Sequence, residues 1–201
     1  MSKIKTVGIV GTGVIGTGWI IRNLAHNKIV HAYDQNKNLK SYVLKEIKRT
    51  SKSIKKLFGK KILIKNLKFF NSLEKALVNV DFVQESVLEN YKVKTDLIHK
   101  ISKYVKSDII ISSSSSGLLP SKIFSKSENP QRGIIGHPFN PAYLLPAVEI
   151  VPGKKTTKKF LLDANKYYKS ISMKPIMLKK ELPGYLSDRL QEALWREGLH
   201  I

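Results

Sequence analysis

The chain has 201 residues, of which 36 are Lys or Arg and 15 are Asp or Glu, so its formal net charge is +21, and it contains no cysteine. The lack of cysteine excludes disulfides, thiolate metal sites and cysteine nucleophiles. Only five of the basic residues are arginine, the residue favoured for base readout and for bidentate phosphate contacts. The composition therefore predicts a solvated lysine surface. A nucleic-acid-binding function would have only the net charge in its favour.

A glycine fingerprint follows the first predicted strand, which covers residues 7–10. Gly11, Gly13 and Gly16 satisfy the pattern G-x-G-x-x-G. The first glycine allows a tight strand-to-helix turn, the second lets the backbone approach a pyrophosphate, and the third permits close packing of helix on strand. The spacing therefore predicts a dinucleotide-binding turn.

A helix is predicted over residues 14–27, so Val14 and Ile15 would present free N–H groups to the pyrophosphate. A second predicted strand then ends in Asp34. Its carboxylate would accept hydrogen bonds from an adenosine ribose and repel a 2′-phosphate. We therefore expect NAD as the cofactor in preference to NADP, although Lys37 lies close by in the sequence.

Strands and helices continue to alternate along the chain, which predicts an α/β fold of the Rossmann type with a doubly wound, mostly parallel sheet. The run of serines at residues 112–116 could simply form a flexible loop. Further strands are expected over residues 67–70, 81–85, 108–112, 133–136, 148–151 and 175–178, and helices over 38–58 (with a break near Ser51 left open), 72–78, 89–105 and 156–171.

The last predicted helix, over residues 184–201, is amphipathic, with apolar residues from Leu186 to Leu194 on one face and no C-terminal cap signal. Such a helix needs a partner for its apolar face. We therefore expect an NAD-binding domain over residues 1–182 and, over 183–201, the first helix of an all-helical C-terminal domain that is otherwise missing.

No apolar run is long enough to span a bilayer, and the first strand begins too close to Met1 to leave room for a signal peptide. A cytoplasmic protein with no membrane partner is expected.

Several polar residues fall where predicted strands end, which is where ligands bind in open α/β sheets. They are Ser116, His137, Asn140 and Glu149. Imidazole suits the removal of a hydroxyl proton at neutral pH, a carboxylate on its far nitrogen would fix the tautomer, and serine and asparagine would bind the substrate oxygen. Taken singly, these residues could also have purely structural roles. His137 could be a core histidine, Asn140 could mark a turn before proline, and Glu149 could pair with a surface lysine.

Together these residues are similar to those of the 3-hydroxyacyl-CoA dehydrogenase superfamily, and the resemblance covers essentially the whole chain. It implies that Ser116, His137 and Glu149 are the catalytic serine, histidine and glutamate, and that Asn140 is the substrate-site asparagine.

The segment 89–94 also resembles a block of that superfamily, Glu-Asn-x-Lys-x-Lys. The resemblance implies that Glu89 and Lys94 lie near the nicotinamide ribose and the substrate. Within the superfamily, three segments most resemble the L-carnitine dehydrogenases, and these are residues 113–121, 137–146 and 188–197.

Asp188 stands where the acyl-CoA enzymes carry asparagine. A carboxylate suits a substrate with a quaternary ammonium group, and Phe139, Tyr143 and Trp195 would offer aromatic faces for cation–π contact. The alternative interpretation is that these aromatic residues pack in the core or at an interface.

The resemblance implies NAD-dependent oxidation of a 3-hydroxy substrate, first of all L-carnitine to 3-dehydrocarnitine, with His137 as general base oriented by Glu149 and with no metal. The alternatives are a 3-hydroxyacyl-CoA or L-gulonate 3-dehydrogenase. Family members continue into a helical domain that closes the site and forms a homodimer. A different class of function therefore stays open, an NAD-binding fragment without turnover.

Overall fold

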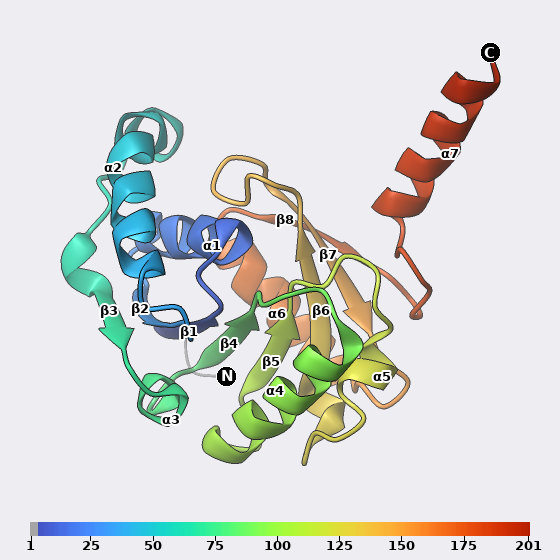
Figure 1. Ribbon diagram of the computed structural model, residues 1–201, viewed down its shortest axis with the longest axis horizontal. Helices are drawn as coiled ribbons and strands as arrows, with labels where there is room; N and C mark the ends of the chain where they lie inside the picture. Colours follow the sequence, from blue (N-terminus) through green and yellow to red (C-terminus); the bar gives the residue numbers. More distant parts are fainter. Residues whose placement is uncertain (1–3) are drawn as a thin grey trace.

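Eight strands form one continuous sheet in the computed structural model, which describes residues 4–201 (Figure 1). The order across the sheet is β3-β2-β1-β4-β5-β6-β7-β8, and every neighbouring pair is parallel except β6 with β7. The predicted doubly wound, mostly parallel sheet is confirmed. The strands are β1 Thr6–Val10, β2 Ile29–Tyr33, β3 Leu67–Phe70, β4 Phe82–Glu85, β5 Ile110–Ser113, β6 Gly133–Pro138, β7 Ala147–Pro152 and β8 Lys174–Met177.

Helices cover both faces of the sheet, and each layer has its own apolar core. Trp19, Ile47 and Tyr168 belong to the core under α1, α2 and α6, whereas Ile98 and Ile123 belong to the core under α3, α4 and α5. Figure 1 shows α4 and α5 in front of the sheet and α6 behind it. The helices are α1 Val14–Ala25, α2 Leu39–Phe58, α3 Leu73–Leu77, α4 Tyr91–Tyr104, α5 Pro120–Ile123, α6 Lys158–Ser170 and α7 Ser187–His200, with 3₁₀ turns η1 Ile64–Asn66 and η2 Pro130–Arg132.

The β6–β7 pair is antiparallel because only residues 139–146 join the two strands, fewer than the dozen or so that a parallel crossover needs. In this register His137 lies directly opposite Glu149. The expectation that Glu149 stands at the C-terminal end of its strand is therefore wrong. It is near the start of β7, and it reaches the same end of the sheet as His137 because β7 runs the other way.

The structure also defines two local features that the sequence pattern left open. α2 is continuous, so there is no break near Ser51, whose Oγ donates to the carbonyl oxygen of Ile47 at 2.5 Å and is satisfied within the helix. Ser112 and Ser113 belong to β5, so only the rest of the serine run is a loop. The sequence pattern missed α5, although Pro120 at its first turn is a helix-start signal.

α7 projects away from the sheet, and none of its residues is buried (Figure 1). Leucines on its exposed surface include Leu194 and Leu199, which are 76% and 71% exposed. Within residues 4–201, no helix is both long enough and apolar enough to cross a membrane.

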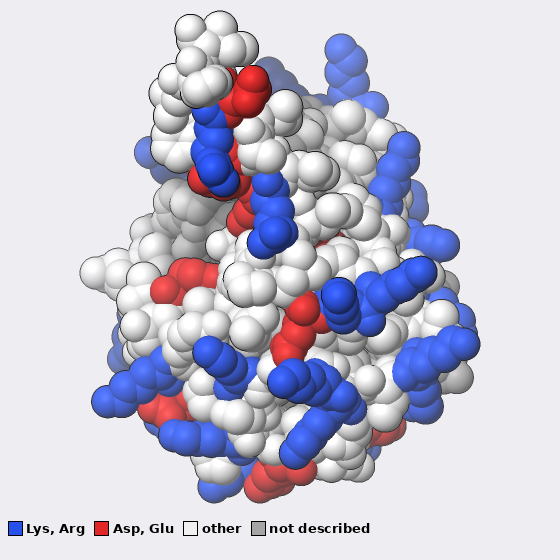
Figure 2. Space-filling view, turned by 90° about the vertical axis from the view of Figure 1, so that its right-hand side faces the viewer, with Lys and Arg blue, Asp and Glu red and all other residues white. Residues whose placement is uncertain are grey.

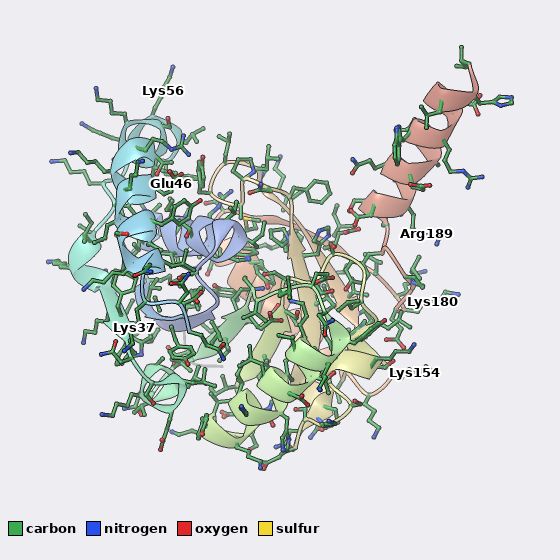
Figure 3. The ribbon with its side chains drawn as sticks, in the orientation of Figure 1. Lys37, Glu46, Lys56, Lys154, Lys180 and Arg189 are labelled. Atoms are coloured by element: carbon green, nitrogen blue, oxygen red, sulfur yellow. The ribbon has the colours of Figure 1, made fainter. Side chains whose placement is uncertain are left out.

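Basic side chains are dispersed over the surface. Figure 2 shows lysines and arginines spread across one face and interspersed with acidic residues. Lys37, Lys56, Lys154 and Lys180 lie at separate places around the periphery (Figure 3). On the face shown, the charge therefore forms no single stripe of the kind that tracks a nucleic-acid backbone.

Candidate active site

Two cavities lie at the carboxyl end of the parallel strands and share Ser86 and Val87 in their walls. The first, about 1140 Å³, is lined in part by Gly11 and Gly13, and we call it the glycine cavity. The second, about 860 Å³, is lined in part by His137, and we call it the histidine cavity. Ligands of open α/β sheets bind at this end, so both cavities are placed for binding.

The turn between β1 and α1 requires glycine at two positions. Gly11 has a φ of +88°, and a Cβ there would lie 2.7 Å from the backbone of Ser86. A Cβ on Gly16 would clash with the carbonyl oxygen of Gly11, which leaves no space between α1 and the turn. Gly13 is different, because its Cβ would meet no protein atom within 4 Å. Its backbone is thus open to a ligand in the glycine cavity.

α1 starts beside this turn without a side-chain cap. The first N–H groups of any α-helix lack intrahelical acceptors, and here no capping side chain takes them up. The positive end of the helix dipole therefore favours an anion there. Val14 opens the helix and is 58% exposed, while Ile15 lines the histidine cavity.

Asp34 follows β2 and lines the glycine cavity. Its Oδ2 accepts from the backbone N–H of Thr12 at 2.6 Å, and its Oδ1 accepts from that of Asn36 at 2.8 Å. These bonds fix the carboxylate at the cavity wall, and Oδ1 retains a lone pair for a ligand. Lys37 is exposed in the same loop (Figure 3).

His137 Nδ1 lies 2.8 Å from Glu149 Oε2. Glu149 is fully buried, and it also accepts from Leu186 N–H at 3.0 Å, from Ser187 N–H at 2.9 Å and from Ser187 Oγ at 2.6 Å. Burial alone would raise the pKa of Glu149, but the bonds from His137, Ser187 and Leu186 together lower it. A carboxylate only accepts, so Nδ1 carries the hydrogen and Nε2 of the neutral ring has the free lone pair.

Ser116 and Asn140 line the same cavity as His137, and both are exposed to it. The loop after β5 is fixed by Glu89, whose Oε1 accepts from Ser116 N–H at 2.9 Å and from Ser115 Oγ at 2.5 Å. No residue among those described bonds the Ser116 hydroxyl. Asn140 precedes the cis bond to Pro141. Both side chains are therefore available to a ligand beside the imidazole.

Lys94 lies behind the wall of the site and lines neither cavity. Its side chain is 1% exposed, and Nζ contacts Glu85 Oε1 at 2.8 Å, the carbonyl oxygen of Val87 at 3.1 Å and Glu89 Oε2 at 3.5 Å. The lysine is thus positioned to hold Glu89 and the strand end that carries Val87.

Asp188 and Phe139 line the histidine cavity. Burial raises the pKa of Asp188, and the negative charges of Glu149 and Glu89 add to this rise while His137 opposes it. Within residues 4–201, Asp188 forms no ion pair. It is a carboxylate that a cation in the cavity would stabilise.

Two of the predicted aromatic residues lie outside this cavity. The Tyr143 hydroxyl bonds Arg49 at 3.3 Å and its ring packs against the core, while Trp195 is 64% exposed on α7. The sequence pattern also missed Ser187, which bonds Glu149, and Ser86 at the junction of the cavities. Ser86 follows the end of β4, a position similar to the one that drew attention to Ser116.

Comparison with known proteins decides the family. The model of the 3-hydroxyacyl-CoA dehydrogenase, NAD binding domain, matches residues 6–182. The chain belongs to this family. The L-carnitine dehydrogenase of Pseudomonas putida is 43% identical over 202 residues, covering 100% of this chain and 63% of that protein. The L-carnitine dehydrogenase of Oceanobacillus iheyensis is 43% identical over 199 residues, covering 98% of this chain and 65% of that protein.

Solved structures of other dehydrogenases share the fold. A 5-formyl-3-hydroxy-2-methylpyridine 4-carboxylic acid 5-dehydrogenase, described as an NAD⁺-dependent dismutase, superposes with a TM-score of 0.91 at 25% identity over 98% of this chain and 65% of its own. The 3-hydroxybutyryl-CoA dehydrogenase of Escherichia coli K12 gives a TM-score of 0.87 at 23% identity over 96% of this chain and 43% of its own. The chain thus spans less than two thirds of each of these relatives.

The residues present fit the NAD that this family binds. A Cβ on Gly13 would meet no protein atom within 4 Å, so the backbone there is open to a ligand. The uncapped start of α1 offers N–H groups to a diphosphate. Asp34 Oδ1 is held in place and keeps a free lone pair for the ribose. Among the residues described, no group of three or more His, Asp and Glu side chains is arranged to hold a metal ion.

Proposed function

We propose that this chain carries the cofactor site and the proton-transfer groups of an NAD-dependent 3-hydroxy dehydrogenase that oxidises L-carnitine to 3-dehydrocarnitine. The observation that carries the proposal is the His137–Glu149 pair, 2.8 Å apart, in a cavity that shares two wall residues with the glycine cavity. Bound NAD would accept a hydride from the substrate carbon.

His137 acts as the general base in this proposal. Glu149 holds the hydrogen on Nδ1, so Nε2 is free to take the hydroxyl proton as the carbonyl forms. The imidazolium that results is stabilised by the charge of Glu149, whose lowered pKa keeps it ionised. Ser116 and Asn140 hydrogen-bond the substrate oxygen.

The glycine cavity holds the dinucleotide. Gly11 and Gly16 shape the turn, while Gly13 and the N–H groups of Val14 and Ile15 face the diphosphate. Asp34 accepts from the adenosine ribose, and Glu89 lies near the nicotinamide ribose. Lys94 acts through Glu89 and does not touch the ligand itself.

Carnitine is preferred over an acyl-CoA or gulonate substrate because of the unpaired carboxylate at Asp188. Burial, and after it the negative charges of Glu149 and Glu89, raise the pKa of Asp188, and a quaternary ammonium group would offset those negative charges. Phe139 offers an aromatic face to the same cation. Tyr143 stays a weaker candidate, since its hydroxyl already bonds Arg49.

The extent of the cofactor domain is proposed as residues 1–182, since α7 beyond it buries no residue of its own. We propose that the substrate is a small 3-hydroxy molecule and that the protein is located in the cytoplasm.

The test is NADH formation by the purified chain with L-carnitine, 3-hydroxybutyryl-CoA and L-gulonate, each at saturating NAD. We expect the largest kcat/KM with L-carnitine, and a selective loss with that substrate in Asp188→Asn, which keeps the shape and removes the charge. NAD binding without NADH from any substrate would instead support a cofactor-binding fragment without turnover.

A further inference from the structure

A chain of polar side chains links α1, β4, β5 and α6 beneath the two cavities. All of its members are buried or partly buried, and each bonds at least one other. They are Trp19, Gln84, Ser86, Ser112, Ser114 and Tyr168. The direction of every hydrogen bond in this chain can be assigned from which atoms can only donate or only accept.

Gln84 fixes the direction at the centre. Its Nε2 lies 3.4 Å from the carbonyl oxygen of Gly136, and a carbonyl oxygen only accepts, so this atom must be the amide nitrogen. Its Oε1 then accepts from the Tyr168 hydroxyl at 2.7 Å. The second hydrogen on Nε2 is donated to Ser114 Oγ at 2.8 Å.

Ser114 Oγ is therefore saturated as an acceptor. It receives one hydrogen from Gln84 Nε2 and another from Trp19 Nε1 at 3.1 Å, and an indole nitrogen only donates. The hydroxyl hydrogen of Ser114 is left for Ser86 Oγ, 2.8 Å away. Ser86 is the acceptor in this bond.

The hydroxyl hydrogen of Ser86 has no acceptor among residues 4–201. Ser86 lines both the glycine cavity and the histidine cavity, and its backbone lies against the turn at Gly11. This chain of hydrogen bonds thus leaves one hydroxyl at the junction of the two cavities whose hydrogen is free to be donated to a ligand.

We propose that Ser86 is a preset hydrogen-bond donor to the carboxamide oxygen of the nicotinamide. The inference rests on the proposed function, because a dinucleotide that extends from the glycine turn towards His137 passes the junction at Ser86. On the nicotinamide group itself the carboxamide oxygen is the hydrogen-bond acceptor, whereas the amide nitrogen donates. A donor whose direction is fixed in advance needs no reorganisation to bind it, and it orients the ring.

Calorimetry with Ser86→Ala tests this directly, with NAD and ADP-ribose as paired ligands, since ADP-ribose lacks the nicotinamide. We expect NAD affinity to fall about fivefold and ADP-ribose affinity to stay unchanged, as for one lost hydrogen bond. Thionicotinamide adenine dinucleotide, whose sulfur is a weaker acceptor, should bind wild type less tightly than NAD, and Ser86→Ala should remove most of that difference.

Ser112→Ala is the matched control. It removes a serine from the far end of the same series of hydrogen bonds, and Ser112 lines neither cavity. It should lower the melting temperature without changing the ratio of NAD to ADP-ribose affinity. Ser86→Thr keeps the hydroxyl and should keep the wild-type ratio.

These measurements distinguish a failure of the Ser86 donor role from a failure of the proposed function. If wild type binds NAD and Ser86→Ala leaves the ratio unchanged, the donor role is wrong while the proposed function stands. An equal loss of both ligands in Ser86→Ala, or a change confined to the KM of the hydroxy substrate, also overturns the donor role. Failure of wild type to bind NAD overturns the proposed function and this inference with it.

Discussion

At the scale of single residues, the site depends on side chains whose hydrogen bonds leave one atom free for a ligand. His137 donates through Nδ1 and keeps Nε2, Asp34 is fixed by Thr12 and Asn36 and keeps a lone pair on Oδ1, and Ser86 keeps a hydrogen. In each case, the bonds to the protein decide which atom is left to accept a hydrogen bond from a ligand or to donate one to it.

Asp34→Asn tests the ribose acceptor with little change of shape. The amide keeps an oxygen for one backbone N–H but loses the charge that repels a 2′-phosphate. We expect NAD affinity to fall and the preference for NAD over NADP to shrink by about tenfold, as for a lost charge-assisted bond. Titration of both dinucleotides measures this, and an unchanged preference would show that Asp34 does not contact the ribose.

Glu149→Gln tests the charge beside His137 through its pH dependence. Because the pKa of Glu149 is lowered on folding, its charge stabilises the fold above the unfolded pKa of about 4.3, and this contribution is lost as the pH falls through the folded pKa. We expect Glu149→Gln to reduce the free energy of unfolding by about 1–3 kcal/mol at pH 7, and by less as the pH falls below about 4.

Denaturant unfolding of both proteins across this pH range gives the measurement. A difference that stays constant with pH would mean that shape and packing, and not the charge, account for the contribution of Glu149. The same variant should lose turnover at neutral pH, but less than His137→Ala, because the imidazole remains.

At the scale of elements, the antiparallel β6–β7 pair and the start of α7 build the half of the candidate site that holds His137 and Glu149. β7 brings Glu149 opposite His137, and the first turn of α7 bonds Glu149 through Ser187. The sequence predicted that both strands exist but not that they pair in opposite directions. That direction follows from their short connection. The predicted bounds put it at residues 137–147, close to the minimum for a parallel crossover, so the pattern alone did not decide the direction.

Hydrogen exchange tests how α7 is held. Its first turn is tied to Glu149, but none of its residues is buried, whereas α4 buries Ile98 and Ile101. We expect backbone amides of α7 beyond Leu190 to exchange at least tenfold faster than those in the middle of α4. Equal protection of the two helices in solution would show that α7 packs against another surface.

At the scale of the whole molecule, the doubly wound sheet could be predicted from sequence because alternating periodicity and the glycine fingerprint are both local signals. The positions of His137, Ser116 and Asn140 at one end of the sheet followed from the same logic. Lys94 and Tyr143 did not line the cavities, because their polar groups are taken by Glu85 and Arg49, and such long-range partners leave no local pattern in the sequence.

The proposed function depends on one chain joining a dinucleotide cavity to a histidine base. It is tested most directly by measuring NAD affinity and NADH formation from L-carnitine in wild type and His137→Ala. We expect turnover to fall by about 10²–10⁴-fold while the dissociation constant for NAD changes less than about twofold, because His137 lines the histidine cavity and not the glycine cavity. Full turnover in His137→Ala would contradict the claim.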